Sequence, residues 1–152
     1  MRVCCILVVA GLLGWSGASL AAGDDTPPAA TASPELVQAQ GMVKAKRYTD
    51  AIPMLQSVIR AAPDNADALN LLGYSLRKTK DFGAAETAYN RALAADPKHL
   101  GALEYLGELY LETQRPEEAE SILRRLDDIC LFGCEEYDEL KEAVAAFRAK
   151  GG

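Results

Sequence analysis

Histidine and tryptophan are nearly absent from this chain of 152 residues, which has one of each, His99 and Trp15. A catalytic or metal site built from paired imidazoles is therefore excluded within one chain. Basic side chains are in the minority, since 16 Lys and Arg face 22 Asp and Glu, for a net charge of -6. Without a basic patch, this balance argues against a protein that follows nucleic-acid phosphates. The hydrophobic share of 49% and the charged share of 25% are typical of a soluble globular protein.

Catalytic sequence patterns are missing as well. The sequence has no Ser/His/Asp set, no phosphate-binding glycine loop and no run of metal ligands. Acidic pairs at 127–128 and 135–136 are interpreted as charges at helix ends and on solvated faces, not as catalytic dyads. His99 follows Lys98 in a turn and is expected to be solvated. We therefore predict a protein that is not an enzyme and that holds no cofactor or metal.

The N-terminus has the pattern of a secretory signal peptide. Arg2 gives a positive start, an almost entirely apolar run follows, and small residues precede a cut after Ala21. We predict a signal peptide at 1–21 and therefore a periplasmic or secreted bacterial protein. An uncleaved membrane anchor is the alternative, because the apolar run approaches the roughly 20 residues that span a bilayer. Residues 22–33 are rich in Ala, Thr, Pro and Asp without apolar periodicity, and they are predicted to form a disordered linker.

An internal repeat with a period of about 34 residues organises the rest of the chain. The residues that recur at this spacing are Ala51, Ala85 and Ala119; Leu69 and Leu103; Leu72 and Leu106; Gly73 and Gly107; and Pro63 and Pro97. Each unit has the apolar spacing of two amphipathic helices joined by a short turn. Gly73 and Ala85 are small because paired helices approach closely where they cross, and Pro97 ends the second helix. These features predict an all-α fold, an α-solenoid of three helix-turn-helix repeats.

The middle unit resembles the tetratricopeptide repeat family. The residues that carry the resemblance are Leu69, Leu72, Gly73, Leu76, Phe82, Ala85, Tyr89, Ala92 and Pro97. The resemblance extends over three repeats, at 34–65, 66–99 and 100–131. The third repeat has Pro116 where its second helix should begin, and it has Leu131 where the family usually has a proline. The first repeat departs more, and its Pro53 should cost a helix hydrogen bond unless that helix starts at about Thr49. We expect the first helix of that repeat to be the loosest element.

The C-terminal tail has the pattern of a capping helix. A solenoid needs its open end covered, because each repeat buries its apolar face only against its neighbours. Residues 132–150 are predicted to supply this cover, since Tyr137, Leu140, Val144 and Phe147 fall on one stripe of a helix. A stripe that binds a partner is the alternative.

The four cysteines form two separate pairs. Cys4 and Cys5 lie in the predicted signal peptide and would leave with it. Cys130 and Cys134 lie between the last repeat and the capping helix, and Gly133 between them favours a chain reversal. In an exported chain, the simplest interpretation is a disulfide that closes this turn. A redox-active pair and a metal site shared with a second chain are the alternatives.

The family resemblance implies a binding surface. In the tetratricopeptide repeat family, the first helix of each repeat lines a concave groove in which peptides or partner helices dock. The positions that this places in the groove are Gln40, Lys44, Asn70, Tyr74, Arg77, Glu104, Tyr105, Glu108 and Glu112. They also stand off the apolar stripe of each helix, so we expect them to face solvent, and an ordinary hydrated surface is the alternative. We expect one end of the groove to be basic and the other acidic, opposite a basic part of the partner.

The best-known groove chemistry of the family is missing from this sequence. Members that bind chaperone tails use a carboxylate clamp of lysines, asparagines and an arginine. Those positions hold Leu36, Gln40, Leu71, Gly101 and Tyr105, so binding of a C-terminal Glu-Glu-Val-Asp tail is not expected.

The predicted function is that of an interaction scaffold. We expect an adaptor that binds a peptide or helix of another protein in the groove and helps to assemble an envelope complex. Two alternatives stay open, namely a structural protein that self-associates into a homo-oligomer and a redox or metal-handling module based on Cys130 and Cys134. No nucleic-acid partner is expected, and a membrane would be reached only through an uncleaved signal peptide.

Overall fold

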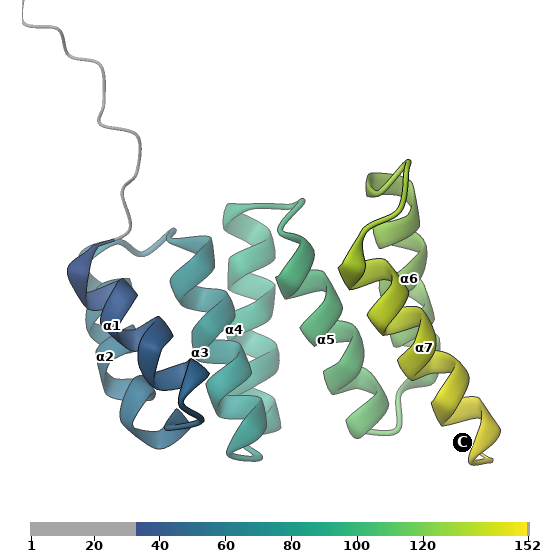
Figure 1. Cartoon of the computed structure of the whole chain (residues 1–152), viewed down its shortest axis with the longest axis horizontal. Coiled ribbons are helices and arrows are strands. Elements are labelled where there is room, and N and C mark those ends of the chain that lie inside the picture. The colour runs from purple at the N-terminus through teal and green to yellow at the C-terminus, as the bar shows by residue number, and fades with distance from the viewer. Residues whose placement is uncertain (1–32, 152) are drawn as a thin grey trace, which may run out of the picture. The chain divides into compact units, whose positions relative to one another are not determined.

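The computed structural model describes residues 33–151 (Figure 1). In this part of the chain there are seven α-helices and no strand. The helices are α1 (Pro34–Lys44), α2 (Tyr48–Ala61), α3 (Ala66–Lys78), α4 (Phe82–Ala95), α5 (Leu100–Glu112), α6 (Pro116–Ile129) and α7 (Glu135–Ala149). The prediction of an all-α fold is confirmed. The predicted signal peptide at 1–21, and the predicted linker up to residue 32, lie outside the described residues.

Side-chain caps begin four of the helices. Ser33, Asn65, Asp81 and His99 each accept a hydrogen bond from the backbone N–H three residues further on, which satisfies one of the free amides of a first helical turn. Pro116 is the first residue of α6, as predicted, where its missing N–H costs nothing. Each of these helices therefore begins where a short sequence pattern places it.

His99 does more than occupy a turn. Its Nδ1 accepts from the Ala102 N–H at 3.1 Å, and its Nε2 lies 3.1 Å from Oδ1 of Asp67 at the start of α3. The His99 side chain is 14% exposed. The expectation of a solvated histidine was wrong, because the ring caps α5 and links it to the preceding repeat.

The turn inside each repeat has the same backbone geometry. Lys46, Lys80 and Gln114 occupy equivalent positions of the three repeats, and they are the non-glycine residues with positive φ, at 59°, 70° and 62°, within the described part. In each case the next residue donates its N–H to a carbonyl five positions back, which closes the first helix of the pair. The period of the sequence is thus repeated in the backbone as well as in the side chains.

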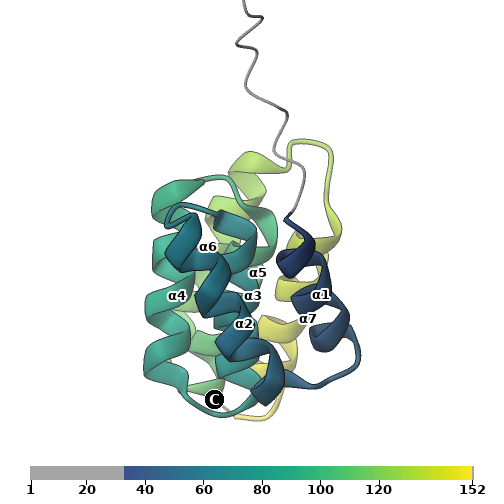
Figure 2. The ribbon, with the colours of Figure 1, turned by 90° about the vertical axis from the view of Figure 1, so that its left-hand side faces the viewer.

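The helices form two layers. The first helices of the pairs, α1, α3 and α5, lie next to one another, and α7 continues their layer, while α2, α4 and α6 cover the other side. Figure 2 looks from the α1 end and shows α4 on one side and α1 and α7 on the other. We call the surface of α1, α3, α5 and α7 the first-helix face.

Small residues allow close helix approach, as predicted. Ala51, Ala85 and Ala119 are each fully buried. At Gly73 a Cβ atom would lie 2.6 Å from the Tyr89 ring, which is itself fully buried in α4. No side chain larger than hydrogen fits there without moving an aromatic ring.

Helix α7 covers the open end of the stack. Leu140 and Val144 are buried, and Tyr137 and Phe147 pack against the core at its edge, so the predicted stripe is confirmed. A Cβ at Gly107 would lie 2.5 Å from Leu140, which shows how closely α7 approaches α5. Leu140 follows Leu106 by one full repeat period, so α7 has the register of a fourth first helix.

Pro53 lies inside α2, which begins at Tyr48. The amide that would donate to the carbonyl of Thr49 is therefore missing. Pro53 is exposed, so water can reach this carbonyl.

Within 33–151, no helix has both the length and the apolar character needed to cross a bilayer.

Candidate partner-binding face

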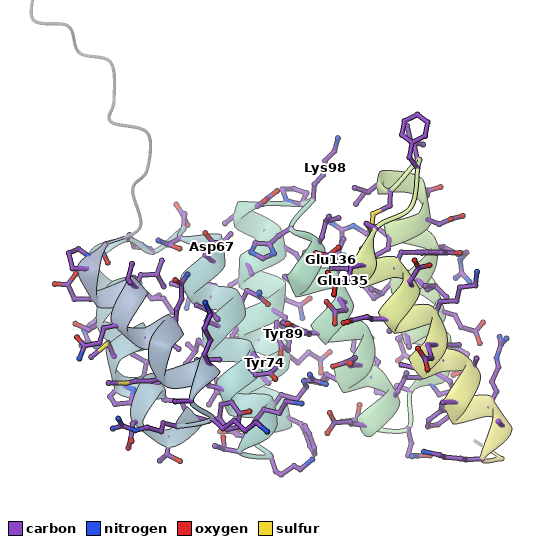
Figure 3. The ribbon with its side chains drawn as sticks, viewed as in Figure 1. Asp67, Tyr74, Tyr89, Lys98, Glu135 and Glu136 are labelled. Atoms are coloured by element: carbon purple, nitrogen blue, oxygen red, sulfur yellow. A yellow bond between two sulfur atoms is a disulfide. The ribbon has the colours of Figure 1, made fainter. Side chains whose placement is uncertain are left out.

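The predicted groove residues all lie on α1, α3 and α5, and thus on the first-helix face. On α1, Gln40 is half-buried and Lys44 is exposed. Tyr74 of α3 and Tyr105 of α5 are half-buried, and their ring centroids are 4.8 Å apart. Figure 3 shows Tyr74 at the lower part of α3, on the side toward α5.

A third tyrosine joins this pair. The Tyr48 ring, from the start of α2, lies 5.8 Å from that of Tyr74 in an edge-to-face arrangement. The sequence prediction missed Tyr48, because it belongs to a second helix. Tyr48, Tyr74 and Tyr105 form a row of rings across the repeats, which we call the tyrosine row. Such a row offers flat contact area whose side chains are already held in place.

Arg77 is buried between α3 and α5. Its side chain is 2% exposed, its Nη1 lies 2.9 Å from Oε1 of Glu112, and its Nη2 pairs with Glu108. Its guanidinium carbon is also 5.5 Å from the ring centroids of both Tyr74 and Tyr105. The expectation that Arg77 faces solvent was therefore wrong, since the neighbouring repeat covers it. The expected separation of a basic end from an acidic end was also wrong, because these charges meet and offset one another.

Arg77 keeps its positive charge although it is buried. Burial opposes a positive charge, but the carboxylates of Glu108 and Glu112 outweigh it and raise the pKa of Arg77. At Tyr89, burial disfavours the ionised phenolate and therefore raises the pKa, so this side chain stays a neutral phenol. In residues 33–151, the Tyr89 hydroxyl and Arg77 Nε are buried without a hydrogen-bond partner. The guanidinium is thus held through its outer nitrogens and by the aromatic rings.

Glu104, on the opposite flank of α5, is buried without a cation. It is 4% exposed. Burial, a hydrogen bond with Glu139 of α7 and the charge of Glu108 raise the pKa of Glu104 to about 9. Glu104 is therefore protonated at neutral pH. It was expected to be a solvent-facing acid, and that expectation was wrong because α7 packs over it.

Asn70 occupies the position of the preceding repeat that is equivalent to Glu104. It is 8% exposed, and its Oδ1 has no hydrogen-bond partner within the described chain. Asn70 also departs from the expected solvent exposure. The same position is thus buried and polar in both repeats.

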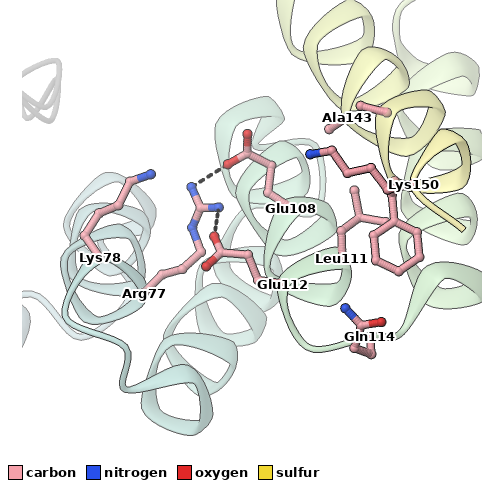
Figure 4. A pocket seen from close by; sticks show the side chains of 10 residues that line it. Arg77, Lys78, Glu108, Leu111, Glu112, Gln114, Ala143 and Lys150 are labelled. Atoms are coloured by element: carbon pink, nitrogen blue, oxygen red, sulfur yellow. Dashed lines mark hydrogen bonds and ion pairs between the residues drawn. The ribbon is translucent and has the colours of Figure 1, made fainter. Parts of the chain in front are cut away.

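A cleft of about 390 Å³ opens between the last turns of α3, α5 and α7 (Figure 4). Its lining residues are Arg77, Lys78, Glu108, Leu111, Glu112, Gln114, Ala143, Ala146, Phe147 and Lys150. Of the predicted groove residues, only Arg77, Glu108 and Glu112 line it. The predicted groove includes no residue of α7, whose partner-binding stripe was only the alternative, although the period that links Leu106 to Leu140 could have revealed its contribution. We call this hollow the cleft.

The two cysteines close the turn between α6 and α7. The sulfur atoms of Cys130 and Cys134 lie 2.13 Å apart, a disulfide distance, and Gly133 has the positive φ of 82° expected there. The redox state of this pair in the cell stays a prediction. No group of three or more potential metal ligands occurs within 33–151.

Paired helices stacked in two layers, with aromatic side chains and a cleft along the first helices, define a helical-repeat protein. Two family models described as tetratricopeptide repeat match the chain, at residues 36–99 and 76–144. The chain belongs to the tetratricopeptide repeat family. A comparison with curated protein sequences gave no match.

Solved structures with this fold come from distant proteins. The chain resembles the Yersinia enterocolitica type III secretion translocator chaperone SycD with a TM-score of 0.69 and 18% identity, over 76% of this chain and 81% of that one. It resembles the first TPR domain of human RPAP3 with a TM-score of 0.66 and 23% identity, over 76% and 91%. It resembles the TPR2B domain of yeast Sti1, solved in complex with pHsp70, with a TM-score of 0.69 and 17% identity, over 76% of this chain and 94% of that one. At these identities, the likeness shows the fold alone.

Proposed function

We propose that this protein is an exported interaction adaptor, which binds an extended or helical segment of a partner protein along its first-helix face and serves in an envelope complex. The observation that carries the proposal is the tyrosine row, which leads across the repeats toward the cleft. Aromatic rings fixed by their neighbours supply contact area at low entropic cost. An adaptor role is favoured over an enzyme because the face holds aromatic and paired charged groups and no catalytic constellation among the described residues.

Structures of related fold support a peptide as the occupant. SycD has been solved with a peptide of the translocator YopD, and the first TPR of Spaghetti (RPAP3) has been solved with the HSP90 peptide SRMEEVD. Our protein lacks the carboxylate clamp, so its partner would be held by other contacts. Because Arg77 already offsets Glu108 and Glu112, and Glu104 is neutral, we no longer expect the partner to be basic.

The test uses two exposed lysines on the first-helix face, Lys44 and Lys78. We expect Lys44→Glu with Lys78→Glu to reduce capture of the native partner from cell-envelope extracts about tenfold, equivalent to about 1.4 kcal/mol. Arg60→Glu, on an exposed position of α2 outside this face, is the matched control and should leave capture unchanged. Equal capture by the double variant and the wild type would show that the partner binds elsewhere.

A further inference from the structure

The tip of the α6–α7 turn exposes two large apolar side chains. Leu131 is 79% exposed and Phe132 is 102% exposed; among the described residues, Val37 is the other large exposed hydrophobic side chain. Two contacts fix the conformation of this turn. The Gly133 N–H donates to the Cys130 carbonyl at 2.9 Å, and the sulfur atoms of Cys130 and Cys134 lie at disulfide distance. Exposed neighbouring apolar groups of this size indicate a contact surface.

The charges around the tip restrict what it can contact. Residues 127–136 contain four carboxylates, of Asp127, Asp128, Glu135 and Glu136, and no basic side chain. An anionic membrane surface would repel this segment. The complementary surface is an apolar hollow with a basic rim.

The cleft has this chemistry. Leu111, Ala143, Ala146 and Phe147 supply apolar walls. Its lining has three cations and two carboxylates, and Arg77 already pairs with both carboxylates. Lys78 and Lys150 are exposed and take part in no ion pair within 33–151. The cleft thus presents a net positive rim on a chain whose net charge is -6.

The tip cannot reach the cleft of its own chain. It lies just before α7, whereas Phe147 and Lys150 lie at the end of that helix. Fifteen residues of helix separate the two by about 22 Å. Figure 1 shows the α6–α7 turn and the C-terminal end at opposite ends of α7.

We propose that the Leu131–Phe132 tip of one copy inserts into the cleft of a second copy. The contact joins two different surfaces, so each copy keeps one free tip and one free cleft, and association continues head to tail. The contact is small, which predicts weak, concentration-dependent association. The proposal does not depend on the adaptor function, although a partner bound in the cleft would compete with the tip.

Sedimentation velocity of the chain as isolated from cells, over a concentration series, tests this contact. We expect the sedimentation coefficient to rise with concentration for the wild type. Phe132→Ser and the double variant Lys78→Glu with Lys150→Glu should each weaken association at least tenfold. Val37→Ser, which removes the other exposed hydrophobic, is the control and should associate like the wild type. Circular dichroism checks that each variant is folded.

Mixing the two defective variants gives the decisive result. Phe132→Ser keeps its cleft, and the double lysine variant keeps its tip, so the mixture should form a one-to-one complex that grows no further. The proposal is overturned if the wild type stays monomeric at all concentrations, if neither variant weakens association, or if the mixture does not associate. A monomeric wild type would assign the tip to a different protein.

Discussion

The two flanks of α5 hold acidic side chains in opposite ways. Toward α3, Glu108 and Glu112 meet the guanidinium of Arg77. Toward α7, Glu104 meets another carboxyl group, that of Glu139, and keeps its proton at neutral pH. The α3–α5 junction thus holds a charge pair, whereas the α5–α7 junction holds a neutral carboxyl group. The first should be insensitive to pH near neutrality, whereas the second should weaken as the pH rises.

The largest effect is expected from breaking the charge-paired junction. Glu108→Gln with Glu112→Gln leaves Arg77 as a buried cation, since its side chain is only 2% exposed. Removing one side of a buried ion pair typically costs about 3–5 kcal/mol, and the partial exposure of the two carboxylates lowers the expected loss to about 3 kcal/mol. Urea denaturation of the wild type and the variant measures this free energy of unfolding.

Glu117→Gln is the matched control for that variant, because Glu117 is exposed and takes part in none of the ion pairs of residues 33–151. It should change the free energy of unfolding by less than about 0.5 kcal/mol. If the double variant is no less stable than this control, the charge-paired junction does not hold α3 and α5 together.

A smaller and pH-dependent effect is expected at the protonated junction. The pKa of Glu104 rises from 4.5 to about 9 on folding, so between these values the folded chain binds more protons than the unfolded chain. Stability then falls as the pH rises, by at most about 1.4 kcal/mol per pH unit. Glu104→Gln removes this penalty. The full shift would set a limit of about 5 kcal/mol at pH 8, and water that enters around the ionised carboxylate reduces this penalty. We expect the variant to match the wild type at pH 4 and to exceed its stability by about 2 kcal/mol at pH 8.

Urea denaturation at pH 4, 6 and 8 measures this difference, and the contributions of carboxylates that do not interact with Glu104 cancel between variant and wild type. Glu142→Gln, at an exposed position of α7, is the control and should show no such trend. A constant difference between Glu104→Gln and the wild type across the series would mean that Glu104 is ionised in the folded protein.

Much of the fold could be predicted because its determinants are local or periodic. The close approach at Gly73, the start of α6 at Pro116 and the buried stripe of α7 each follow from helix geometry and the spacing of the repeats. These patterns need no knowledge of which helix lies beside which.

The burial of Arg77 and Glu104 could not be predicted in the same way. A prediction from an amphipathic stripe assumes that a helix has one buried face, but a first helix in a solenoid has neighbours on both sides. Arg77 is covered from α5, where it meets Glu112, and Glu104 is covered from α7. Positions off the apolar stripe are therefore buried wherever the neighbouring first helix or α7 packs against them.

The cleft escaped prediction for a related reason. The sequence favours a cover for the open end as the role of α7 and gives a partner-binding stripe only as the alternative, so the predicted groove contains no residue of this helix. Because α7 has the register of a fourth first helix, Phe147 and Lys150 extend that face beyond the three repeats.

The most direct test of the account is site-specific photo-crosslinking in the native cell envelope. A photoreactive amino acid would replace Lys44 or Lys78 on the first-helix face, and Arg60 or Asn90 on exposed positions of α2 and α4. If the first-helix face binds the partner, the substitutions at Lys44 and Lys78 will yield one common crosslinked protein, and those at Arg60 and Asn90 will not. The same protein crosslinked from Arg60 and Asn90, with no product from Lys44 and Lys78, would contradict the account.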